Sequence, residues 1–206
     1  MSKETERAED ERLIGNFLGG DSLAFDQLVL KYQKKVVNLC YRLMGEYDEA
    51  VDCAQETFVK VYRSLEHFRF QSNFSTWLFR ITVNTCKNRL TSLKYRFHRR
   101  MIRLDGDGRL GRDVHLGRSA ENPGSIEIAN GSASPSAALE KKEIKELLQR
   151  AIDSLPKTQR TALVLRDVES LSYEEIGRIL GLSLGTVKSR IARAREQLKS
   201  ILRGIL

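Results

Sequence analysis

The chain has 206 residues, a length that favours one or two domains. Its formal net charge of +8 and sequence pI of about 9.5 favour a polyanionic partner. It has no run of 18 apolar residues, and its N-terminus, MSKETERAEDER, is too acidic and polar for a signal peptide. We therefore expect a cytoplasmic protein without membrane insertion. Cys40, Cys53 and Cys86 lack CxxC or Cys/His spacing, which predicts buried reduced thiols, no metal site and no cofactor.

Apolar residues recur at helical spacing through the first third of the chain. After a frayed stretch at 1–12, the pattern predicts a short helix at 13–18, a long helix that Gly45 ends, and a third at 48–65. The outer face of the third helix is acidic and polar, but it also carries an apolar side chain. This combination favours a protein-docking face over a purely solvated one. Its residues are Asp48, Asp52, Gln55, Glu56 and Val59.

From His67 to Leu104 the sequence has nine Arg and Lys residues but no Asp or Glu, an electrostatic footprint for phosphate. The spacing predicts a helix from Ser75 to about Leu93 that is apolar on two sides, with one narrow polar stripe between them. In this stripe the cations would hold phosphate and the amides could read base edges. The stripe contains Arg80, Asn84, Lys87 and Thr91, with Asn88 beside it.

The loop before this helix interleaves aromatic rings with Arg, Gln, Ser and Asn. Rings can stack on an unpaired base while amides and hydroxyls read its edges. The alternative is that Phe68, Phe74 and Trp77 close the helical core, and the sequence leaves both interpretations open. The set is Phe68, Arg69, Phe70, Gln71, Ser72, Asn73, Phe74 and Trp77.

A change in composition separates the two ends of the chain. Residues 104–136 hold six of the 14 glycines and two of the three prolines, without sustained periodicity. We therefore expect an all-α fold class with two small helical domains, at 10–97 and 137–206, and a flexible linker at 98–136.

The last part of the second domain has the pattern of a helix-turn-helix. Ser172 and Glu175 are spaced for a capping box, Gly181 can supply the turn, and Ser183 can cap the second helix. Apolar positions of that helix share one face, and its opposite face is basic. This is the arrangement that reads the DNA major groove.

These segments together resemble a bacterial extracytoplasmic-function (ECF, group 4) RNA polymerase sigma factor. YDEAVDCAQETFVKVYRSL resembles family region 2.2, FSTWLFRITVNTCKNRL resembles regions 2.3 and 2.4, and LPKTQRTALVLRDVESLSYEEIGRILGLSLGTVKSRIARAREQLK resembles region 4. Three motifs in this order make a specific signal. The sequence departs from the family at Phe70 and Gln71, where Gly and an acidic residue are common.

The resemblance implies a non-enzymatic factor that binds core RNA polymerase, directs it to promoters and opens the DNA. The acidic face would dock on the clamp helices of the largest subunit, and the second domain on the flap. The stripe and the aromatic loop would read and melt the minus-ten element, as duplex and as non-template single strand. An anti-sigma factor is a further expected partner. The minus-thirty-five element would be read by Thr186, Lys188, Ser189, Arg190, Ala192 and Arg193.

Two other functions would each account for part of the sequence. A free-standing helix-turn-helix regulator that binds only duplex DNA would explain the C-terminal residues but not the acid-free block. A nucleic-acid enzyme would need clustered carboxylates or metal ligands near the basic surface. His67, His98 and His115 are scattered instead, and the basic block has no carboxylate.

Overall fold

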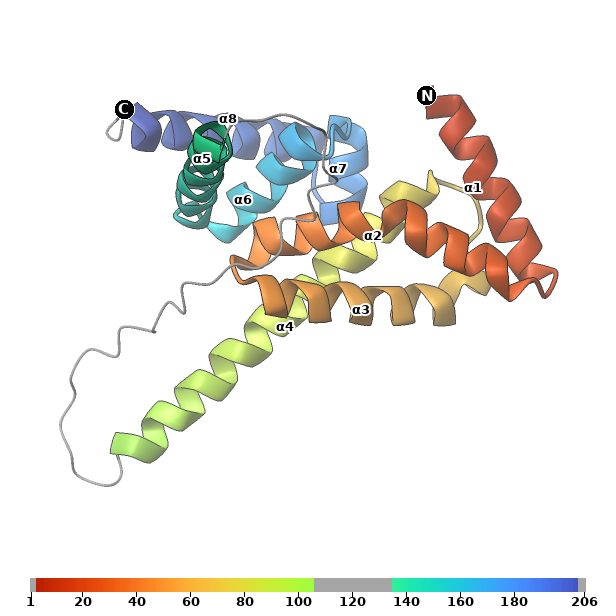
Figure 1. Ribbon diagram of the computed structural model, residues 1–206, viewed down its shortest axis with the longest axis horizontal. Helices are drawn as coiled ribbons and strands as arrows, with labels where there is room; N and C mark the ends of the chain where they lie inside the picture. The colour runs from red at the N-terminus through yellow and green to blue at the C-terminus, as the bar shows by residue number, and fades with distance from the viewer. Residues whose placement is uncertain (1–2, 106–134, 204–206) are drawn as a thin grey trace.

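The computed structural model describes residues 3–105 and 135–203, which are mainly helical with no strand among them, as the all-α prediction required. The middle of the expected linker lies outside the described residues. Figure 1 shows the arrangement. The helices are α1 (Lys3–Leu18), α2 (Ser22–Met44), α3 (Tyr47–Ser64), a 3-10 turn η1 (Leu65–His67), α4 (Phe74–Asp105), α5 (Pro135–Asp153), α6 (Lys157–Leu163), a π-helical segment η2 (Val164–Val168), α7 (Tyr173–Leu180) and α8 (Leu184–Arg203).

The first four helices form an N-terminal bundle in which α2 packs between α1, α3 and α4. The Asp21 carboxylate caps α2 by accepting a hydrogen bond from the Leu23 amide at 3.0 Å. Gly45 ends the helix at a φ of 84°, a left-handed conformation that glycine adopts without steric cost. Side chains without solvent exposure fill the core between the helices: Val36, Leu39, Val61, Leu65 and Leu78.

Two helices are longer than the sequence predicted. Residues 3–12 were expected to be frayed, but they belong to α1, which polar contacts hold against α2. The buried Asp10 carboxylate accepts hydrogen bonds from Lys31 Nζ at 2.7 Å and from the Tyr32 hydroxyl at 2.6 Å. Helix α4 runs on to Asp105, beyond the expected end near Leu93, since it has no glycine or proline to stop it.

The last four helices form a C-terminal domain in which α6 and α7 pack against α8. Five apolar positions of α8 were predicted to face inward. Val187, Ile191 and Ala194 are buried, whereas Leu198 and Leu202 are half-buried. The turn before α7 is closed by Arg166, whose guanidinium donates a hydrogen bond to the Leu171 carbonyl at 2.6 Å and lies over the Tyr173 ring.

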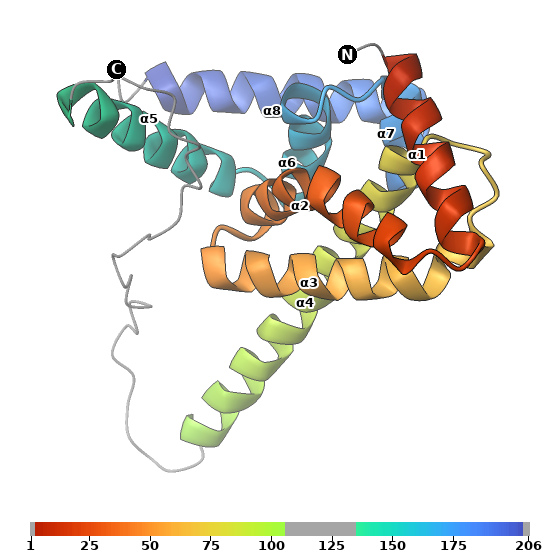
Figure 2. The ribbon, with the colours of Figure 1, turned by 45° about the vertical axis from the view of Figure 1, so that its right-hand side comes forward.

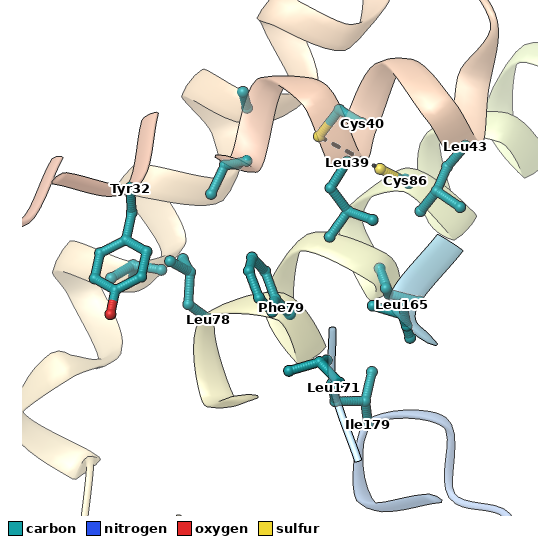
Figure 3. Packing of buried hydrophobic residues seen from close by; sticks show 14 of the residues in the cluster. Tyr32, Leu39, Cys40, Leu43, Leu78, Phe79, Cys86, Leu165, Leu171 and Ile179 are labelled. Carbon is teal, nitrogen blue, oxygen red and sulfur yellow. Dashed lines mark hydrogen bonds between the residues drawn. The ribbon is translucent and has the colours of Figure 1, made fainter. Parts of the chain in front are cut away.

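The two domains share one apolar core. Helix α4 packs on α7, and α2 lies against α5 and α6 (Figures 1 and 2). In Figure 3, Leu165, Leu171 and Ile179 of the C-terminal domain gather beside Phe79 of α4. A polar contact flanks this core, where Arg160 donates a hydrogen bond to the Leu43 carbonyl at 3.1 Å. The surfaces expected on separate domains are therefore joined in one body.

The contact between the domains contains a carboxyl group that responds to pH. Burial raises the pKa of Glu169 to about 7 from its ordinary 4.5, and the charge of Lys35 on α2 offsets only part of this. The folded protein therefore holds a proton that the unfolded chain releases. The stability gained from this proton is complete below about pH 4.5 and is lost as the pH rises through about 7.

Glu169→Gln, which cannot ionise, is expected to raise the melting temperature relative to the wild type at pH 8 and to lose that advantage at pH 5. Thermal unfolding at both pH values measures this difference. Glu66→Gln, at an exposed carboxylate on η1, is the control and should follow the wild type throughout. An equal shift from Glu169→Gln at both pH values would contradict the explanation by ionisation.

Candidate nucleic-acid interface

The polar stripe of α4 is exposed as predicted. Packing on both flanks of the helix brings this about, because Phe79, Val83 and Cys86 are buried on one flank and Phe74 and Leu78 on the other, while the ribbon between the flanks faces solvent. Thr82 and Thr85 are also buried, so neither contributes to the exposed surface. The stripe that the structure brings together contains Arg80, Asn84, Lys87 and Asn88.

The aromatic loop divides into core and surface residues. Phe68 and Phe74 are buried, with 7% and 3% of their surface exposed, so the interpretation as core holds for these two. Phe70 remains exposed, and its ring centroid lies 4.9 Å from that of Phe68. Trp77 is half-buried against both buried rings.

Phe70 is the aromatic ring of this loop with the greatest access to solvent. Its φ of 55° is left-handed, which is uncommon for a residue with a side chain and is a strained conformation typical of functional loops. The sequence departs from the resembled family at this position. Of the remaining loop residues, Arg69 and Gln71 are exposed, whereas Ser72 and Asn73 are half-buried.

The helix-turn-helix has the local geometry that its sequence predicted. Ser172 Oγ accepts a hydrogen bond from the Glu175 amide at 3.2 Å, and Glu175 Oε2 accepts one from the Ser172 amide at 2.7 Å. Gly181 makes the turn at a φ of 67°. Ser183 Oγ accepts from the Thr186 amide at 3.3 Å and so caps α8. The two helices are therefore held at a defined angle.

The outer side of α8 carries the residues predicted to read the major groove. Lys188, Ser189, Ala192 and Arg193 are exposed, while Thr186 and Arg190 are half-buried. The Ser189 hydroxyl donates to the Thr186 carbonyl at 3.0 Å. The Ser189 side chain is thus oriented by its own helix, and the exposed cations Lys188 and Arg193 are accessible to phosphate.

A cavity of about 470 Å³ lies where the two predicted DNA surfaces meet. Asn84 and Lys87 of α4 line one wall, and Arg190 of α8 lines another. This proximity could not be expected from the sequence, because a long linker separates the two surfaces. In this arrangement part of each surface faces the other.

The acidic face of α3 is exposed at all five predicted positions, including Val59, which is 48% exposed. The structure adds Arg89 of α4, which sequence reasoning missed. Its guanidinium pairs with Glu49 at 2.5 Å and Asp52 at 2.9 Å, and the hydrogen bond to Glu49 raises the pKa of Arg89. This ion pair joins the acidic face to the basic helix.

Comparison with known proteins matches both halves of the chain. The family model for Sigma-70 region 2 matches residues 28–96, and that for Sigma-70 region 4 matches residues 145–198. The RNA polymerase sigma-H factor of Pseudomonas aeruginosa is 39% identical over 198 residues, which is 96% of each chain. The ECF RNA polymerase sigma-E factor of Escherichia coli is 39% identical over 192 residues, or 93% of each chain. The chain belongs to the ECF sigma factors of RNA polymerase.

Solved structures agree with this assignment. The sigma factor RpoE of Bartonella quintana, in complex with the anti-sigma factor NepR, superposes with a TM-score of 0.60 and 27% identity, over 87% of this chain and 96% of that one. CnrH, in complex with the cytosolic domain of CnrY, superposes with a TM-score of 0.64 over 95% and 98% of the two chains; at 24% identity it shows the fold alone.

This ECF sigma factor is thus a non-enzymatic transcription initiation factor, as the resemblance implied. Among its described residues, no helix is long and apolar enough to cross a membrane.

Proposed function

We propose that this sigma factor binds core RNA polymerase through α3 and reads promoters through α4 and α8. The exposed ribbon of Arg80, Asn84, Lys87 and Asn88 carries the proposal, because a helix packed on both flanks exposes a single acid-free row of cations and amides. Residues 10–97 would act as region 2, with the linker at 98–136 and region 4 at 137–206. The site of action is the cytoplasm.

DNA opening is assigned to the loop before α4. Phe70 is exposed and supported by the buried ring of Phe68, so it can stack on an unpaired base of the non-template strand. Arg69 and Gln71 beside it can contact phosphate and base edges. Phe68 and Phe74 support the loop from the core. Binding an unstacked base would offset the few kcal/mol that flipping costs.

The minus-thirty-five element is assigned to the exposed side of α8, from Thr186 to Arg193. Core polymerase is assigned to the exposed face of α3, where Val59 offers an apolar contact among acidic groups. The clamp helices of the largest subunit would meet this face, and the flap would meet the C-terminal domain. An anti-sigma factor would bind this chain, as NepR binds the sigma factor RpoE of Bartonella quintana in their complex.

Reconstituted transcription tests the proposal. The full chain is combined with purified core polymerase and a library of promoters, and transcripts and complexes are measured. Specific initiation that depends on the chain is the expected result. Binding to duplex promoter DNA without any binding to core polymerase would instead support the free-standing regulator.

The stripe of α4 is expected to divide its roles between residues. Asn84→Ala should change which minus-ten sequences are used, since losing a base contact alters discrimination by about 1–3 kcal/mol. Lys87→Ala should weaken all promoters to a similar degree and reduce the slope of log affinity against log salt by about 1. Promoter-library transcription and binding at several salt concentrations measure these effects.

Lys34→Ala is the matched control, because it removes an exposed lysine of α2 that lies outside the stripe. It should leave both promoter preference and salt slope at wild-type values. Uniform losses across the library for Asn84→Ala, equal to those for Lys87→Ala, would contradict the division of roles.

A further inference from the structure

Three thiols from three helices meet in the core of the N-terminal bundle. Cys40 of α2, Cys53 of α3 and Cys86 of α4 are fully buried, and their sulfur atoms all lie within 4.8 Å of one another. The Cys53 and Cys86 sulfurs are 3.4 Å apart, and those of Cys86 and Cys40 are 3.6 Å apart (Figure 3 shows the latter pair). All three are free thiols.

Sequence spacing concealed this cluster. The cysteines are 13 and 33 residues apart along the chain, so no short motif connects them. Each occupies an inward position of its own helix, and only the packing of the bundle brings the sulfurs together. The expectation of buried reduced thiols agrees with the free cysteines, but the absence of a ligand pattern in the sequence says nothing about a site built from three helices.

The charge of the surroundings restricts what three thiolates can bind. A buried charge without a partner is strongly unfavourable. The positive charge of Arg89 acts on Cys53. Arg89 is already paired with Glu49 and Asp52, however, so it is not available to neutralise additional thiolates. Three thiolates around a monovalent or divalent cation leave a net negative charge, whereas three around a trivalent centre leave none.

We propose that Cys40, Cys53 and Cys86 form a binding site for a trivalent thiophilic element such as trivalent arsenic. Arsenous acid, As(OH)₃, is itself neutral. Three As–S bonds form as three As–O bonds break, and the thiol protons leave with the hydroxyl groups as three molecules of water. Arsenic stays trivalent, so the step needs neither an oxidant nor a reductant.

The cluster has an entry path. Cys86 lines the cavity of about 470 Å³ between the two domains, so a small neutral molecule can reach it from solvent. The product would tie α2, α3 and α4 together.

Titration of the reduced full-length chain with arsenite tests the site. The expected result is one arsenic per chain by intact-mass measurement, loss of all three titratable thiols, and a higher melting temperature, because the ligand binds the folded state. Cys40→Ala, Cys53→Ala and Cys86→Ala, made singly, should each weaken arsenite binding by at least about 10²-fold, since one of three linked donors is lost.

Phenylarsine oxide, which needs only two thiols, separates lost ligands from lost folding. Each single variant should still bind it through its two remaining cysteines. Zn²⁺ is the charge control and should protect the thiols less than arsenite does, because three thiolates around it would leave a buried negative charge. The proposal is overturned if the wild type fails to bind arsenite, if any single variant binds it as tightly as the wild type, or if Zn²⁺ protects equally well.

Discussion

Gly177→Ala is expected to disrupt the helix-turn-helix and to weaken binding to the minus-thirty-five element. A β-carbon at this position would lie 2.9 Å from the Leu182 carbonyl oxygen, which belongs to the backbone of the turn. The turn cannot easily move away, because the Leu182 amide donates a hydrogen bond to the Gly177 carbonyl at 3.0 Å. Overpacking of this kind costs about 1–3 kcal/mol, so α7 and α8 would change their relative angle.

Gly185→Ala provides the matched control. Gly185 lies in the first turn of α8 with nothing within 4 Å of an added β-carbon. Replacing it should be neutral or should stabilise the helix by up to about 1 kcal/mol. Chemical denaturation and binding to a minus-thirty-five duplex measure the effects. Similar stabilities for the two variants would show that the turn tolerates the added methyl group.

Glu175→Ala is expected to lower the free energy of unfolding by about 2–4 kcal/mol, combining loss of a helix cap with loss of buried hydrogen bonds. Oε2 of this carboxylate accepts from the Ser172 amide at 2.7 Å. Oε1 accepts from the Thr76 hydroxyl at 3.2 Å and from the Asn73 amide at 3.4 Å, both in the N-terminal domain. A single buried side chain thus supports α7 and the contact between domains.

Two single variants separate these contributions. Ser172→Ala removes the cap alone, and Thr76→Val removes a bond between the domains alone. Denaturation of the single and double variants forms a mutant cycle, in which Thr76→Val and Glu175→Ala should show a coupling of at least about 0.5 kcal/mol. Additive losses within error would mean that the Thr76 bond contributes nothing to stability.

Local patterns predicted the parts of this protein whose structure depends on neighbours in sequence. The capping box, the glycine turn and the exposed row on α4 all follow from spacings of three and four residues, which is why they agree with the structure. The family was also evident from motif order. The burial of Val187, Ile191 and Ala194 on α8 agrees with the pattern for the same reason.

Features that depend on distant partners were not predictable in this way. Arg89 pairs with α3 across 40 residues of sequence, and the Gly177 contact depends on how the turn folds back. Phe68, Phe70 and Phe74 are all phenylalanines, so residue type does not predict which of them is buried. The packing of the bundle decides that Phe68 and Phe74 are buried and Phe70 is exposed. The contact between the two domains depends on apolar residues that each domain's own pattern assigned to its own core.

The two oxygens of Glu175 have consequences for how this molecule moves. Oε2 holds the start of α7 while Oε1 faces α4. Separation of the domains would therefore break the bonds of this carboxylate to Thr76 and Asn73, together with the shared apolar core and the bond from Arg160 to the Leu43 carbonyl. The cap on α7 would survive that separation. A C-terminal domain separated from α4 would therefore keep its DNA-reading helices in register, and the conformational entropy of forming them would not oppose binding at the promoter.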